Sequence, residues 1–125
     1  MTLDPLPGVY AICRLPAESP VPPWAAGVFS SITRSASELS IVCGAADVPP
    51  AVQAERGYRG LAVRGPLDFS LVGIVAALAS PLAAASVSIF VVSTYDTDYL
   101  FVREAELERA TAALRGAGHA VATGA

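Results

Sequence analysis

The chain has 125 residues, of which 54% are apolar and 15% charged, and its net charge is −3. That length suits one compact domain or two very small ones that share a core, and the apolar content excludes a disordered chain. The basic residues are eight scattered arginines, so no basic patch supports nucleic-acid binding.

The chain begins with a short segment that precedes the first strand. Residues 1–7 are expected to form a loose arm, and residues 8–15, GVYAICRL, are predicted to form a strand with two alternating faces. Four prolines within residues 16–23 exclude a regular helix there. We expect Trp24 to fill the core beneath this loop, and stacking on a ligand is the alternative.

Two more strands are predicted before the middle of the chain. Residues 28–33 and 38–43 read as strands joined by a turn, and residues 51–55 are expected to form one helical turn. Cys13 and Cys43 are too few for a disulfide framework and lack the spacing of metal ligands. We therefore interpret them as buried thiols in a reducing cytoplasm, although a disulfide is geometrically feasible if their strands are neighbours.

A strand and an apolar helix are predicted to begin the second half. Residues 60–64, GLAVR, form the strand, and Gly65-Pro66 ends it. Ser70 is then expected to be the N-cap of the helix. Apolar residues at spacings of three and four predict the buried face of that helix. These residues are Leu71, Ile74, Val75, Leu78 and Leu82.

Two strands and a charged helix are predicted to follow. Residues 87–94 and 98–102 read as strands joined by a turn at Tyr95-Asp96-Thr97. The next segment has glutamates in its first turns and arginines later, which matches the helix dipole. Its predicted buried stripe is Leu107, Ala110 and Leu114. Residues 119–122 can add a final short strand.

One membrane interpretation has to be considered. Residues 69–95 carry no charge and are long enough to span a bilayer. We reject a span because Pro81 lies near the middle and because the residue types change at Val87 from alanine-rich to β-branched and aromatic. The start of the chain has no basic segment followed by an apolar run, so no signal peptide is expected and we predict a cytoplasmic protein.

The segment SLVGIVAALASPLAAASVSIFVVSTYDTDYLFVREAELERA, residues 70–110, resembles the ACT-domain proteins of the CASTOR type. These are small bacterial proteins with tandem ACT modules, related to the cytosolic arginine sensors of animals. Residues 32–43, ITRSASELSIVC, resemble the corresponding part of the first module. The resemblance implies an α+β, ferredoxin-like βαββαβ fold with antiparallel sheets. It implies two modules packed as one unit, residues 1–55 with degenerate helices and residues 56–125.

The resemblance also implies a ligand site where the loop before the first helix of one module meets strands of another. Backbone groups before the helix would receive an amino-acid carboxylate, and these belong to Leu71, Val72, Gly73 and Ile74. A Cβ at Gly73 would block close approach there, and amides at a helix start favour an anion. The walls of the pocket would be Ser93, Thr94 and Tyr95. By position, Asp98 would hold the cationic end of the ligand.

Catalysis and metal binding have weaker support in the sequence. Asp96 and Asp98 form a carboxylate pair that could serve acid–base chemistry, but their spacing equally suits a turn and a solvated face. No histidine, cysteine or lysine is positioned to join them. His119 is the single histidine and cannot make a metal site by itself, and no glycine-rich phosphate loop is present.

The sequence therefore predicts a regulatory protein without chemistry of its own and without a cofactor or metal. Its ligand would be a cationic or small polar amino acid bound at an ACT module interface. Exposed edge strands and apolar helix faces predict a homodimer, and a further protein partner could read the bound state. The alternative is a ligand-free module that only dimerises or docks on a partner protein.

Overall fold

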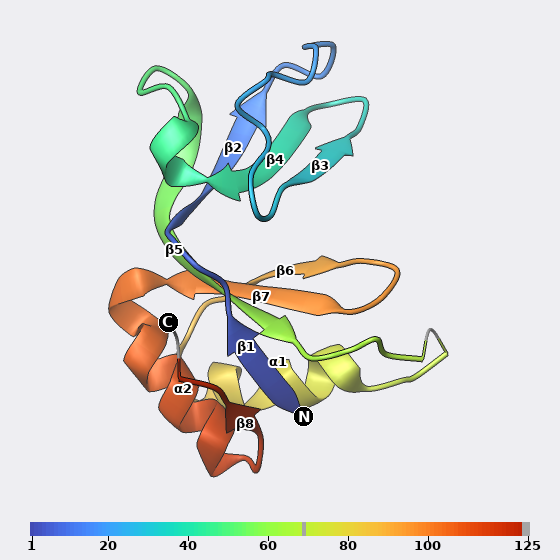
Figure 1. The fold of residues 1–125 in the computed structure, drawn as a ribbon, viewed down its shortest axis with the longest axis vertical. Helices are drawn as coiled ribbons and strands as arrows, with labels where there is room; N and C mark the ends of the chain where they lie inside the picture. The colour runs from blue at the N-terminus through green and yellow to red at the C-terminus, as the bar shows by residue number, and fades with distance from the viewer. Residues whose placement is uncertain (69, 124–125) are drawn as a thin grey trace. The chain divides into compact units, whose positions relative to one another are not determined.

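The computed structural model describes residues 1–68 and 70–123, which fall into two compact units. The unit called here the N-terminal unit is Gly8–Tyr58. The C-terminal unit combines Met1–Pro7 with the described residues from Arg59 onward. Strand β5 (Gln53–Val63) contributes residues to both units (Figure 1).

The N-terminal unit is an antiparallel sheet in the order β3-β4-β2-β5. Its other elements are β2 (Tyr10–Leu15), β3 (Ser31–Arg34), β4 (Leu39–Gly44) and the 3-10 helix η1 (Ala45–Asp47). The three strands predicted in this region are confirmed: β2 and β3 are shorter than predicted, and β4 is shifted by one residue. The helical turn predicted at residues 51–55 is wrong, because Gln53 already pairs with Arg14 of β2. Strand pairing overrides a weak local preference there.

One face of this sheet carries the core of the N-terminal unit. Trp24 is partly buried against that core, as expected for the residue beneath the proline-rich loop. The core residues are Ala11, Cys13, Leu39, Ile41, Cys43 and Val48. Cys13 lies opposite Ile41 and Cys43 lies opposite Ala11, so the two cysteines are diagonal neighbours on adjacent strands. Both are buried, free thiols.

Both thiols are expected to resist alkylation in the folded protein. Burial raises the pKa of Cys13, and burial followed by the neighbouring Cys13 raises the pKa of Cys43 to about 11. The reactive thiolate at pH 8 is then roughly 100-fold scarcer for Cys43 than at the ordinary pKa of 9. We expect labelling by iodoacetamide at pH 8 to be at least about 100-fold slower in buffer than in denaturant. Equal rates in both would contradict the burial of the pair.

The same pKa shift has a consequence for stability at high pH. A raised folded-state pKa means that the native protein holds its thiol protons more tightly than the unfolded chain does. The stabilisation is therefore fully present below pH 9 and is lost as the pH rises toward 11, through the folded pKa of Cys43. Cys43→Ser is expected to remove this contribution to the loss of folding stability at high pH. The denaturation midpoint, measured between pH 8 and 11, checks it.

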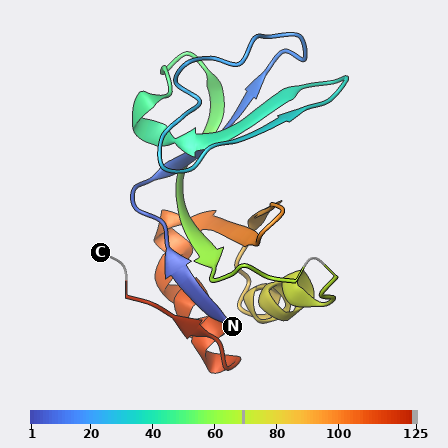
Figure 2. The same cartoon turned by 45° about the vertical axis from the view of Figure 1, so that its right-hand side comes forward.

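The C-terminal unit has the βαββαβ order of a ferredoxin-like fold, with one strand added to its sheet. Besides β5 it contains α1 (Ile74–Ala84), β6 (Phe90–Ser93), β7 (Asp98–Arg103), η2 (Glu104–Glu106), α2 (Leu107–Gly116), β8 (Ala120–Val121) and β1 (Thr2–Pro5). The strand order is β6-β7-β5-β1-β8. The predicted α+β fold class is confirmed, and so are the hairpin turn at residues 95–97 and the charged helix (Figures 1 and 2).

A single core lies between this sheet and the two helices. Leu78 and Leu82 of α1 and Ala110 and Leu114 of α2 are fully buried in it. The strands contribute Leu3, Leu61, Val63, Leu100, Val102 and Val121. Leu61 and Val63 of β5 and Leu100 and Val102 of β7 are spaced two residues apart and point to the same face of the sheet. Both helices cover that face.

The loose arm expected at residues 1–7 is wrong, because Thr2–Pro5 forms strand β1 inside the sheet of the C-terminal unit. Leu3 lies opposite Val63 of β5 on one side and Val121 of β8 on the other, and it is fully buried. The β1–β8 pair is parallel, so the sheet is not purely antiparallel as predicted. The segment forms a strand because both of its edges find partners from distant parts of the chain.

The predicted start of the apolar helix is also wrong. Ser70 does not cap it; its amide and hydroxyl both donate to Asp68 Oδ1, at 2.9 and 2.7 Å. The helix begins at Ile74, after Gly73 in the left-handed region with φ of +79°. Leu71 therefore precedes the helix and is 52% exposed, unlike the buried position predicted for it.

The predicted change from helix to strand within residues 69–95 is confirmed by α1 and β6. The strand is shorter than the predicted 87–94, since it starts at Phe90 after an irregular segment that includes Ser86 with φ of +59°. No helix within residues 1–68 and 70–123 has the length and apolar character needed to cross a membrane.

Gly60 of β5 occupies a position where a larger residue does not fit. A Cβ at this position would lie 2.7 Å from Leu6 Cδ1 and 2.9 Å from Phe101 Cε1. We expect Gly60→Ala to destabilise the protein by about 1–3 kcal/mol, because core overpacking forces neighbouring side chains out of place. Gly116→Ala is the matched control, since nothing lies within 4 Å of a Cβ there and the residue ends a helix. Chemical denaturation of both variants measures the difference, and equal stabilities would contradict the close packing.

Candidate functional site

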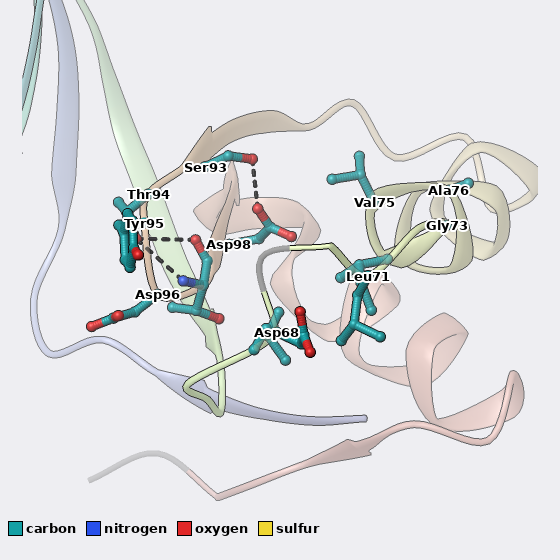
Figure 3. A pocket seen from close by; sticks show the side chains of 13 residues that line it. Asp68, Leu71, Gly73, Val75, Ala76, Ser93, Thr94, Tyr95, Asp96 and Asp98 are labelled. Atoms are coloured by element: carbon teal, nitrogen blue, oxygen red, sulfur yellow. Dashed lines mark hydrogen bonds between the residues drawn. The ribbon is translucent and has the colours of Figure 1, made fainter.

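A pocket of about 390 Å³ lies between the start of α1 and the β6–β7 hairpin of the C-terminal unit. Figure 3 shows side chains from these two walls facing one another. The helix side contributes Leu67, Asp68, Leu71, Gly73, Ile74, Val75 and Ala76. The hairpin side contributes the six consecutive residues 93–98. Volumes of this size are typical of sites for small molecules.

Asp98 is the buried carboxylate of this pocket, with 9% of its surface exposed. It begins β7 directly opposite Ser93, the last residue of β6, so the hairpin register brings the two side chains together. Ser93 Oγ donates a hydrogen bond of 2.5 Å to Asp98 Oδ1 (Figure 3). A hydroxyl is a neutral partner, and burying a carboxylate is costly unless a cation also meets it. The site therefore favours a positively charged group beside Asp98.

The hairpin turn is held in place by bonds within itself and to the segment before α1. Thr94 N–H donates to the carbonyl of Thr97 at 2.8 Å, which closes the turn. Leu67 N–H donates to the carbonyl of Asp96 at 2.7 Å, and Thr97 Oγ1 donates to the carbonyl of Val63 at 2.6 Å. The bond between Leu67 and Asp96 joins the two walls of the pocket, and the bond from Thr97 ties the hairpin to β5 next to Asp98.

Thr97 is expected to stabilise this arrangement through its hydroxyl. Thr97→Val removes the bond to Val63 at nearly constant volume, so we expect a loss of about 1 kcal/mol. For a domain of this size the melting temperature should fall by roughly 4 °C. Thr97→Ser retains the hydroxyl and is expected to keep most of the stability. If both variants melt alike, the bond contributes nothing to the fold.

The start of α1 offers backbone donors to the pocket. The first hydrogen bond within the helix runs from Ala77 N–H to the Gly73 carbonyl, so the amides of Ile74, Val75 and Ala76 precede the intrahelical ladder. Such amides and the helix dipole favour an anion. A Cβ on Gly73 would meet nothing within 4 Å, so Gly73 is required by its positive φ and not by crowding.

The carboxylates of the pocket have different surroundings. Asp68 is tied into the local turn, where the Ser70 amide and then its hydroxyl hold the pKa of that carboxyl below its usual value. Asp96 is exposed at the hairpin tip, whereas Asp98 is buried. Among the described lining residues, three carry a negative charge and none carries a positive one. The electrostatic potential of the pocket is therefore negative, except next to the amides at the start of α1.

The structure brings together seven of the eight residues implied by the sequence. Those lining the pocket are Leu71, Gly73, Ile74, Ser93, Thr94, Tyr95 and Asp98. Val72 is 90% exposed and is not among the described lining residues. Sequence reasoning missed Leu67, Asp68, Val75, Ala76, Asp96 and Thr97. The site residues were carried over from the resemblance, which implied only residues 71–74 on the helix side; the predicted N-cap, Ser70, also lies three residues before the observed one, Gly73. That these residues bind a ligand stays a prediction.

The arrangement does not assemble a metal centre within the described residues, where no three or more His, Cys, Asp or Glu side chains gather. Asp96 and Asp98 lie on the same pocket wall, but Asp96 is exposed and only Asp98 is buried. What the pocket offers chemically is therefore recognition: amides for an anion at one wall and a buried carboxylate for a cation at the other.

Comparisons with known proteins cover both parts of the chain. A family model described as ACT domain matches residues 53–116, and a second one, described as an N-terminal domain, matches residues 8–51. No curated protein matches the chain. The crystal structure of a protein from Agrobacterium tumefaciens is 43% identical to it, with a TM-score of 0.91. That alignment covers 97% of this chain and 91% of the other.

Two aspartokinase structures are similar at much lower identity. The alpha and beta subunits of an aspartokinase are 15% identical with a TM-score of 0.68, covering 94% of this chain and 97% of that one. The ligand-free regulatory subunit of aspartate kinase from Thermus thermophilus is 11% identical with a TM-score of 0.58, covering 88% and 93%. At such low sequence identities, the similarity shows a shared fold and nothing more.

Proposed function

Since the chain belongs to the ACT-domain family, we propose that it is a non-catalytic regulatory protein that binds an amino acid in the pocket between α1 and the hairpin. The observation that carries this proposal is that one pocket contains both groups that favour an anion and a group that favours a cation. Amides at the start of α1 favour a carboxylate, and the buried Asp98 favours a cation. A free amino acid carries both groups on one small molecule.

The regulatory part of the proposal draws on the fold neighbours. One of them is a regulatory subunit of aspartate kinase, described in its ligand-free form. We propose the same kind of role here, in a cytoplasmic protein of the CASTOR type. Binding would shift the population of two conformations, and a partner protein would read the difference. The free buried thiols Cys13 and Cys43 fit a reducing compartment.

We also propose a homodimer and a tandem-module organisation. Among the described strands β6 pairs with β7 alone, and its Phe90, Val91 and Val92 are partly buried and uncharged. An apolar edge strand without charged side chains is suited to pairing with a second copy. We propose residues 1–55 and 56–125 as the two ACT repeats, the first one with degenerate helices; strand β1 of the first repeat then lies in the sheet of the C-terminal unit.

A thermal-shift screen with the twenty amino acids, paired with a mass measurement in solution, tests the proposal. At 100 times its dissociation constant a ligand stabilises the folded state by about 2.7 kcal/mol, which is a clear shift of the melting temperature. We expect at least one amino acid to produce it. If none does and the mass is that of a dimer, the chain is a ligand-free dimerisation module.

The second candidate, a docking module without a ligand, is favoured by one observation. Four large apolar side chains near the pocket are exposed, which is the pattern of an interaction surface. They are Leu71, Val72, Val75 and Tyr95, with Val72 and Tyr95 at 90% and 80% exposure. In that case the variant Val72→Asp would weaken association without any effect of added amino acids.

A further inference from the structure

Helix α2 and the 3-10 turn η2 line a second depression in the C-terminal unit, called here the α2 groove. Its volume is about 580 Å³, and none of its described lining residues also lines the pocket between α1 and the hairpin. Ala110 and Leu114 occupy another side of α2 and pack into the core. The groove therefore lies on a side of the helix that the core leaves open. Its charged lining residues are Arg59, Glu104, Glu108 and Arg115.

Most charged side chains of η2 and α2 have an ion-pair partner within the same unit. Those with a partner are Glu104, Glu106 and Arg109. The other two, Glu108 and Arg115, are exposed and make no ion pair within residues 1–68 and 70–123. Arg115 uses one N–H donor on the carbonyl of Val121, at 2.7 Å, out of the five that a guanidinium carries. The groove thus presents an acidic group near the start of α2 and a basic group near its end.

The spacing of these two charges matches a second copy of the same helix. Arg115 follows Glu108 by two helical turns, so both side chains lie on one side of α2, about 10 Å apart along its axis. Their midpoint falls between Thr111 and Ala112. If a two-fold axis passes through that midpoint, α2 of a second copy lies antiparallel, and Glu108 of each copy faces Arg115 of the other.

The residues at the midpoint suit this arrangement. The distance between two packed helices depends on the size of the side chains at the point of contact. Thr111 and Ala112 are small and both line the groove, so they let the two helices approach closely enough for the charges to meet. The antiparallel orientation also places the positive dipole end of each helix beside the negative end of the other.

We infer that the α2 groove is a docking surface for a second copy of this chain, with the helices antiparallel and Glu108 and Arg115 as reciprocal contacts. This surface is distinct from the β6 edge proposed above for the homodimer, and it does not depend on amino-acid binding. Stable interfaces bury about 1,200–2,000 Å². One face of a ten-residue helix offers less, and exposed ion pairs are screened by salt. The association is therefore weak and salt-dependent, and it joins single chains or β6-paired dimers.

Charge reversal on the full chain tests this docking surface. Sedimentation equilibrium over a range of concentrations measures the association constant of the parent, of Glu108→Arg and of Arg115→Glu. We expect each single variant to associate at least about tenfold more weakly than the parent, because like charges then face each other. The double variant, with both charges exchanged, should recover the parental constant to within about threefold. An equimolar mixture of the two single variants should also associate, since one presents two basic groups and the other two acidic ones.

Two controls separate this effect from changes in net charge and in folding. Glu18→Arg makes the same charge change at an exposed position of the N-terminal unit and should associate like the parent. Circular dichroism at 222 nm should show parental helix content in every variant. We also expect about 1 M salt to weaken the association of the parent.

Three results would overturn the inference. The first is a parent chain that does not associate further at about 1 mM, which would leave the groove to solvent or to a different protein. The second is a double variant as weak as the single ones, together with a mixture that fails to associate. The third is an equal loss in Glu18→Arg, which would assign the effect to net charge. In each case the amino-acid site and the β6 edge remain to be judged by their own experiments.

Discussion

Replacing Leu3 with aspartate is expected to unfold the C-terminal unit. Leu3 has no exposed surface and lies between Val63 and Val121 in the sheet. The substitution removes core packing and places a carboxylate in an apolar core, a combination that costs about 4–5 kcal/mol or more. That is comparable with the whole stability of a small protein.

Two spectroscopic signals follow the units separately in this experiment. The α-helices of the described chain lie in the C-terminal unit, so circular dichroism at 222 nm follows that unit. Trp24 is the one tryptophan and lies in the N-terminal unit, so its fluorescence follows the other. We expect Leu3→Asp to lose the helical signal at 25 °C. Val28→Asp is the control, since Val28 is 79% exposed, and it should match the parent. A parental helical signal in Leu3→Asp would refute the central position of β1.

Replacing Asp98 with asparagine is expected to weaken ligand binding strongly while leaving the fold intact. The amide has the shape of the carboxylate and can still accept from Ser93 Oγ. The negative charge is lost, and hydrogen bonds to charged groups contribute about 1.5–3 kcal/mol. The affinity for a cationic amino acid should therefore fall by roughly 10- to 150-fold. Without ligand, the melting temperature should stay at or above that of the parent, since the buried charge is gone.

Asp96→Asn is the matched control for that experiment. Asp96 lies on the same hairpin and lines the same pocket, but it is exposed to solvent, which screens its charge. We expect its affinity to change by less than about threefold. Equal losses in the two variants would show that the pocket senses total charge and that Asp98 has no special place in it.

The parts of the fold that were predicted well are those set by neighbouring residues. The hairpin of β6 and β7 has apolar strands on either side of a polar turn, and α2 has acidic residues at its start and arginine near its end. Patterns of this kind need no information from distant parts of the chain. The turn itself was predicted from its own residues, whereas Asp98 was assigned to the site by the resemblance to the ACT-domain proteins of the CASTOR type.

The errors arose where distant residues or competing local bonds decided the structure. Strand β1 exists because Leu3 pairs with residues about sixty and about one hundred and twenty positions away, which no local pattern encodes. Ser70 is a favourable N-cap by residue type, but its amide and hydroxyl both donate to Asp68 Oδ1. The helix therefore begins later, after Gly73 with its positive φ. The helix side of the pocket therefore includes Val75 and Ala76, which the sequence did not imply.

The place of β1 in the sheet also bears on the order in which the protein can fold. Its contacts with β5 and β8 raise the contact order of the C-terminal unit, and contact order slows folding. During synthesis β1 is made early, whereas β8 follows more than one hundred residues later. The sheet of the N-terminal unit can form during synthesis. Strand β1 can pair with β8 only after the C-terminal end of the chain has been made.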